Sequence, residues 1–243
     1  MAKLICLQAG HQNAKNNCDP ALRKGTGALG EVEFTIRIRD RLSQILISKG
    51  FQVQLVDATF NCDPKADDKD YALFLAIHYD ADIYGAGGGF VDFPEPSTDN
   101  ATAESQRIKK AIEEEYFKHS GIVNHPERSN ANTRYYYMWK FLSGPTPCNL
   151  IECGVGKDAH DSVILADTDR VCNAIARGIC KAFSVPFDQT APIPPVEDYK
   201  ALYEAKNAEF EAYKKTSDKE ITDKSTKIIE LQRKIENAMT ALS

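Results

Sequence analysis

Three apolar, strand-like runs in this chain are each followed by a side chain that can bind a metal or move a proton. Leu4–Ala9 leads through a glycine to His11, Tyr71–Ile77 leads to His78, and a third run reaches Glu152. Ligands and catalytic groups gather at the carboxyl edge of open α/β sheets. We therefore expect these side chains to form one site.

Two imidazoles and one carboxylate form the metal-binding part of this predicted site. His11 and His78 are joined by Glu31, which opens a helical pattern after a polar loop. Such a set recurs in catalytic zinc sites, where water takes the fourth position. Zinc lowers the pKa of that water and polarises a carbonyl oxygen. Glu152, outside the metal ligands, could carry the water's proton to a leaving amine, and burial would raise its pKa toward that use.

Each of these residues also has a purely structural interpretation. A His after a Gly can simply end a strand, Glu31 can be a first-turn carboxylate favoured by the helix dipole, and Glu152 can pair with an arginine. Glu33 is an alternative ligand, but it lies two residues further into the helix and would point elsewhere. Asp80 and His125 are further candidates, as a residue that orients a ligating His or as a substrate contact.

The elements that must position these groups alternate between strand and helix patterns. Beyond the three runs, the spacing of apolar residues predicts helices over 31–49, 100–119 and 158–183 and strands over 51–56, 90–93 and 134–142. This order predicts an α/β fold with a twisted, mostly parallel sheet flanked by helices on both faces. Residues 1–185 would form this catalytic domain.

The C-terminal part of the sequence has a different character. Residues 186–196 are rich in proline and predict a linker. Residues 197–243 contain neither Gly nor Pro and predict helix throughout, either as a helical hairpin or as one long helix. Residues 221–242 place apolar residues in a heptad rhythm, so we expect this coiled-coil-like tail to pack on itself, on the α/β domain or on a second copy of the chain.

Composition excludes several classes of function. The 243 residues carry a net charge of −5, which argues against a nucleic-acid partner. No apolar run approaches the roughly 20 residues that span a bilayer, so we expect no membrane insertion. The N-terminus shows no secretory signal pattern, which predicts synthesis in the cytoplasm. Seven scattered cysteines do not form a disulfide pattern.

Several short motifs occur in an order that resembles a known enzyme family. They are Ala9-Gly10-His11, Gly30-Glu31, Gly50-Phe51, Ala76-Ile77-His78 and Leu150-Ile151-Glu152-Cys153-Gly154. From about residue 3 to residue 183 the chain resembles the zinc-dependent N-acetylmuramoyl-L-alanine amidases of phage endolysins and bacterial autolysins. The residues next to the motifs differ from the family pattern, but the ligand types are kept.

The resemblance implies the following expectations. Zinc is bound by His11, Glu31 and His78, with Glu152 as general base and acid, and peptidoglycan is cut between N-acetylmuramic acid and L-alanine. The protein would be a phage endolysin that reaches the cell wall when the host lyses. The alternatives are a related zinc carboxypeptidase, or a non-catalytic module that binds the wall or belongs to a virion.

Overall fold

The computed structural model describes residues 2–11, 27–58, 71–81, 85–94, 103–129 and 146–187, together with Lys224 and Lys227. The chain divides into two compact units, Met1–Ile193 and Pro194–Ser243. In the second unit the two described residues are helical and exposed. The predicted coiled-coil seam over 221–242 and most of the predicted linker lie outside the described residues, as does the predicted strand over 134–142.

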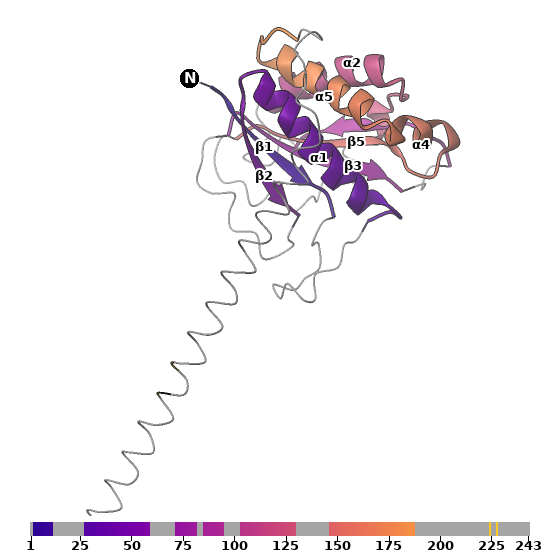
Figure 1. Cartoon of the computed structure of the whole chain (residues 1–243). Helices are drawn as coiled ribbons and strands as arrows, with labels where there is room; N and C mark the ends of the chain where they lie inside the picture. Colours follow the sequence, from indigo (N-terminus) through magenta and orange to yellow (C-terminus); the bar gives the residue numbers. More distant parts are fainter. Residues whose placement is uncertain are drawn as a thin grey trace, which may run out of the picture. The chain divides into compact units, whose positions relative to one another are not determined.

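A five-stranded sheet is the centre of the first unit (Figure 1). Its strands are β1 (Leu4–Ala9), β2 (Gln52–Asp57), β3 (Leu73–Asp80), β4 (Phe90–Asp92) and β5 (Cys148–Val155), in the spatial order β2-β1-β3-β5-β4. The pairs β1–β2, β1–β3 and β3–β5 are parallel, and β4 runs antiparallel to β5. The predicted α/β class with a mostly parallel sheet is confirmed.

The α-helices of the described part of this unit cover one face of the sheet. They are α1 (Glu31–Ser48), α2 (Ala103–Ser120), α4 (Ala159–Ala166) and α5 (Thr168–Ala182), and Figure 1 shows them on the same side. Their apolar side chains share one core cluster with residues of the sheet such as Leu7, Leu75 and Ile151. The opposite face, which includes Phe74 and Leu150, is also buried. Among the described residues no helix covers this opposite face, so the helices predicted for it are not found in this part of the chain.

Helix α1 begins where the sequence predicts. Gly30 precedes it with φ of 82°, a left-handed conformation that glycine adopts without steric penalty. Phe34, Ile38 and Leu42 then recur on one face, and each is 3% exposed or less. Glu31 is thereby fixed at the first turn of a helix that packs on the sheet.

The prediction of a single helix over 158–183 is wrong. The chain forms α4 and α5 instead, with a break at Asp167, whose φ of −83° and ψ of 87° are not helical. The Asp167 side chain accepts a hydrogen bond from the backbone N–H of Arg170 at 3.0 Å and so caps α5. Aspartate favours such caps over helix interiors because its carboxylate competes for backbone donors.

Two strands also extend further than predicted. β3 continues past His78 to Asp80, and β5 continues past Glu152 to Val155. His78 and Glu152 are register partners on these neighbouring parallel strands. Both residues therefore belong to the hydrogen-bonded sheet rather than to the loops that follow it.

Two further predictions can be compared with the described part of the chain. None of its helices is both long and apolar enough to cross a membrane. Five of the cysteines, Cys6, Cys148, Cys153, Cys172 and Cys180, are buried free thiols. This agrees with the absence of a disulfide pattern, while Cys18 and Cys62 lie outside the described residues.

Candidate metal and catalytic site

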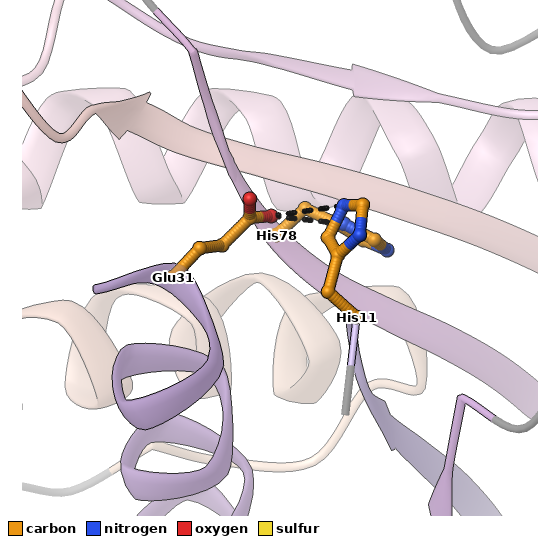
Figure 2. A group of neighbouring side chains, drawn as sticks. All are labelled: His11, Glu31 and His78. Carbon is orange, nitrogen blue, oxygen red and sulfur yellow. Dashed lines mark hydrogen bonds and ion pairs between the residues drawn. The ribbon is translucent and has the colours of Figure 1, made fainter. Parts of the chain in front are cut away.

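Three side chains converge at this edge of the sheet: His11 in the turn after β1, Glu31 at the start of α1, and His78 in β3 (Figure 2). His11 Nε2 lies 3.4 Å from Glu31 Oε1, and His78 Nδ1 lies 3.1 Å from the same oxygen. The two imidazole rings are nearly perpendicular, at 84°, with centroids 4.9 Å apart. One ligand atom from each residue can be chosen so that all three lie within 4.8 Å of one another.

This arrangement fits a zinc ion. Tetrahedral zinc with bonds of about 2.0–2.2 Å holds its ligand atoms roughly 3.3–3.5 Å apart. The separations of 3.4 and 3.1 Å from Glu31 Oε1 are close to that spacing. Two imidazole nitrogens and a carboxylate oxygen are also donors that zinc accepts. The donor set and its spacing therefore both suit the metal.

Two glycines leave space for the side chains of His11, Glu31 and His78. A Cβ on Gly10 would lie 2.4 Å from His78 Cε1, well inside van der Waals contact. A Cβ on Gly27 would lie 2.5 Å from Glu31 Oε2, and Gly27 also has a left-handed φ of 92°. His11 itself has φ of 57°, which is uncommon for a residue with a side chain. The backbone around the three residues is thus shaped to bring them together.

Backbone donors hold the Glu31 carboxylate in place. Its Oε2 accepts a hydrogen bond from Ala28 N at 2.8 Å, and its Oε1 accepts one from Tyr79 N at 3.3 Å. The Tyr79 hydroxyl donates to the Leu29 carbonyl at 2.5 Å, which ties the segment before α1 to β3. Glu31 is only 2% exposed, so these contacts replace water around its charge.

The environment favours the neutral form of the His11 imidazole. Burial lowers the pKa of His11, the neighbouring His78 lowers it further, and the negative charge of Glu31 opposes both. A neutral imidazole is the form that donates its electron pair to a metal. The pKa shift therefore favours the ligating state of His11.

Glu152 lies next to this group in β5, the strand between β3 and β4. It is the register partner of His78 in β3 and of Phe90 in β4. The residue keeps some exposure, but its Oε2 is buried and has no hydrogen-bond partner among the described residues. Burial raises the pKa of Glu152 well above its usual range, and the nearby carboxylates of Glu31 and Asp80 raise it further. No described arginine or lysine pairs with Glu152, so the structural alternative of an Arg partner finds no support in this part of the chain.

The remaining predicted residues lie around the group. Asp80 is two residues after His78 in β3 and interacts with other groups of the chain. His125 is not one of the three clustered residues: its Nδ1 lies 2.7 Å from Glu127 Oε1, and its backbone N–H donates to the Gly89 carbonyl. Glu33, the alternative ligand, is exposed on α1.

Asp161 is an interaction centre that the sequence did not single out. It is 1% exposed, and its Oδ2 accepts hydrogen bonds from Gly88 N at 2.5 Å and Val155 N at 3.0 Å. It thereby joins the glycine-rich segment before β4 to the end of β5. The available signal was the pair Asp158 and Asp161, because an N-cap aspartate followed three residues later by an acid marks a helix start.

Comparisons with known proteins show what this chain resembles. The family model described as N-acetylmuramoyl-L-alanine amidase matches residues 5–183. A comparison with curated proteins finds no match.

Solved structures share the fold. The catalytic domain of CwlV, an N-acetylmuramoyl-L-alanine amidase from Bacillus (Paenibacillus) polymyxa var. colistinus, is 17% identical, with 76% of this chain and 99% of that chain covered and a TM-score of 0.55. Ami1 from Mycobacterium smegmatis is 19% identical, with 75% and 97% covered and a TM-score of 0.58. The catalytic domain of the CD27L endolysin, which targets Clostridia difficile, is 15% identical, with 76% and 99% covered and a TM-score of 0.55.

Proposed function

Because the chain belongs to the N-acetylmuramoyl-L-alanine amidase family, we propose that it is a zinc-dependent hydrolase of peptidoglycan. The bond cleaved is the amide between the lactyl group of N-acetylmuramic acid and L-alanine. The observation that carries the proposal is the convergence of His11, Glu31 and His78 within 4.8 Å, with Glu152 on the adjoining strand.

His11, Glu31 and His78 would hold the zinc ion. Bound zinc lowers the pKa of water toward neutrality and polarises the carbonyl oxygen of the scissile amide. The chain's contribution is to present two imidazoles and one buried carboxylate that already converge in the folded protein. Ala28 N and Tyr79 N keep the Glu31 carboxylate oriented by their hydrogen bonds to its two oxygens.

Glu152 would move the proton. As general base it takes a proton from the attacking water, and as general acid it gives that proton to the amide nitrogen that leaves with L-alanine. A carboxyl group with a raised pKa is suited to both halves of this transfer, because it binds the proton firmly enough to hold it between the two steps.

Product analysis tests this function. The zinc-loaded protein is incubated with purified peptidoglycan, and the soluble products are identified by mass spectrometry. We expect free stem peptides that begin with L-alanine and intact glycan, and we expect Glu152→Gln to lose this release while it retains zinc. Peptides shortened from their carboxyl end would indicate the carboxypeptidase alternative. Zinc binding without any product would indicate the non-catalytic wall-binding or virion module.

We also propose peptidoglycan as the partner and the cell wall as the place of action, as a phage endolysin would require. Addition of the purified protein to intact and to permeabilised bacteria tests this role, since an endolysin must clear at least the permeabilised cells. The C-terminal residues 221–242 are proposed to associate with a second copy of the chain. Sedimentation of the full chain, compared with a chain that ends at Ser184, tests this association, and equal numbers of subunits per particle would contradict it.

A further inference from the structure

The strand that carries Glu152 has an irregularity directly after this residue. His78 of β3 pairs with Glu152 of β5, whereas Asp80 pairs with Val155, so β5 runs from residue 152 to 155 while β3 runs from 78 to 80. One extra residue is therefore inserted into β5, which makes a β-bulge. Gly154 within the bulge has φ of 151°, a conformation that residues with a side chain rarely adopt. Bulges are rare between parallel strands and are over-represented next to active sites.

The position of the bulge decides which face of the sheet Glu152 occupies. Side chains alternate between the two faces along a strand. Ile151, directly before Glu152, belongs to the core cluster under the helices, so Glu152 points to the other face. If the extra residue came before Glu152, this residue would pair with Ile77 of that core cluster instead of with His78. A shift of one residue in register moves a side chain to the opposite face, so the carboxylate would then be directed away from His78.

Two buried side chains from the helices hold the bulge at this position. A bulge interrupts the hydrogen-bond ladder, so its backbone groups need other partners. The hydroxyl of Tyr116 in α2 donates to the Cys153 carbonyl at 2.6 Å. The backbone N–H of Val155 donates to Asp161 Oδ2 in α4 at 3.0 Å. Because Tyr116 and Asp161 are both buried, water does not compete for these hydrogen bonds.

Tyr116 contacts the residue that follows Glu152 in the chain. Burial raises the pKa of Tyr116 well above its ordinary range, so the hydroxyl keeps the proton that it donates to the Cys153 carbonyl. Gly89, before β4, lies against the Glu152 carbonyl so closely that a Cβ on this glycine would overlap the oxygen. The backbone at Glu152 and Cys153 is thus held by both α2 and the segment before β4, and a fixed backbone restricts the rotamers of the Glu152 side chain.

We propose that Tyr116 is a positioning residue for the reaction, because its hydroxyl fixes the bulge after Glu152 and so keeps the Glu152 carboxylate on the face of the sheet that His78 shares. The inference rests on the proposed function, in which Glu152 moves the proton. Proton transfer requires the carboxylate to lie within hydrogen-bond reach of the reacting groups. A misplacement of about 1 Å can reduce a rate on the order of a hundredfold. Tyr116 therefore acts on the rate through Glu152, without contact with the substrate.

Kinetics of the zinc-loaded full chain with a soluble N-acetylmuramoyl peptide test the proposal. Tyr116→Phe should lower kcat about tenfold or more, while KM and the zinc content stay unchanged because other groups bind substrate and metal. Replacement of Tyr116 by 4-aminophenylalanine, which returns a donor to the same place, should restore much of kcat. Replacement by 4-fluorophenylalanine fills the space without a donor and should stay slow, even if Tyr116→Phe does not fold. Tyr71→Phe, at a buried tyrosine on the opposite face of the sheet, is the matched control and should keep the wild-type kcat. A wild-type kcat in the variants without a donor, or no recovery with 4-aminophenylalanine, overturns the inference.

A measurement without catalysis separates this inference from the proposed function. The metal-free full chain is labelled with ¹³C at its glutamate carboxyl carbons, and the NMR signal of Glu152 is identified by its absence in Glu152→Gln. We expect one narrow signal in the wild type and in Tyr71→Phe, and a broadened or split signal in Tyr116→Phe, because the carboxylate then adopts more than one orientation. This result supports the inference even if the wild type cleaves no substrate, which would refute only the amidase function. A Glu152 signal of the same shift and width in the wild type and in Tyr116→Phe overturns the inference.

Discussion

Substitution of Glu152 by glutamine should change how the stability of the metal-free protein depends on pH. The variant keeps the size of the side chain and removes its titration. The pKa of Glu152 is raised in the folded protein, so the folded state binds this proton more tightly than the unfolded chain does. The wild type is therefore most stable, relative to the variant, below the ordinary glutamate pKa, and it loses this advantage as pH rises toward the folded-state pKa.

The size of the effect follows from proton linkage. One group whose proton is bound only in the folded state changes the free energy of unfolding by about 1.4 kcal/mol per pH unit. Between pH 5 and pH 7 the wild type should thus lose up to about 2.7 kcal/mol relative to Glu152→Gln. Loading with zinc should reduce this loss, because a nearby cation favours the ionised carboxylate and lowers its pKa.

Urea unfolding in the presence of a chelator measures the effect at pH 5, 6 and 7. Circular dichroism, which follows the loss of the helices, reports the transition. Glu33→Gln is the matched control, because it makes the same substitution at a glutamate that is exposed on α1. A stability difference between wild type and Glu152→Gln that does not change with pH would refute the burial of a protonated Glu152.

Three further predictions concern the surroundings of the site. Gly10→Ala should weaken zinc binding by about 10–100-fold in a competition assay with a chromogenic chelator, because the new Cβ would displace the His78 imidazole. Asp161→Ala should lower the free energy of unfolding by about 3 kcal/mol, because it leaves the N–H groups of Gly88 and Val155 without their acceptor. Chelation of zinc held at 100 times its Kd should lower the stability by about 2.7 kcal/mol, visible as a fall in Tm by calorimetry. An unchanged zinc affinity of Gly10→Ala, an unchanged free energy of unfolding of Asp161→Ala, or an unchanged Tm after chelation would contradict the corresponding prediction.

The local elements of the fold could be predicted from the sequence, because they depend on local patterns. The apolar spacing from Phe34 to Leu46 and the glycines at 30 and 50 define α1 without reference to the rest of the chain. The apolar runs that lead to His78 and Glu152 likewise define β3 and β5. The residue types of the site followed from these runs, since His and Glu are conspicuous in otherwise apolar strands.

Contacts between distant segments could not be predicted in the same way. His78 and Glu152 are neighbours because β5 pairs with β3, and local alternation carries no information about which strands pair. The hydrogen bond from Gly88 N to Asp161 joins residues 73 positions apart for the same reason. The break at Asp167 was missed because apolar residues continue on both sides of it, so periodicity hides a cap that depends on one carboxylate.

Zinc content is the most direct test of the central claim that His11, Glu31 and His78 share one metal ion. The full chain is stripped with a chelator, incubated with one equivalent of zinc, dialysed, and measured by elemental mass spectrometry. We predict one zinc per chain for the wild type and for the control His160→Ala, and a loss of bound zinc for His78→Ala and Glu31→Gln. Retention of zinc by His78→Ala and Glu31→Gln, or no zinc in the wild type, would contradict the claim.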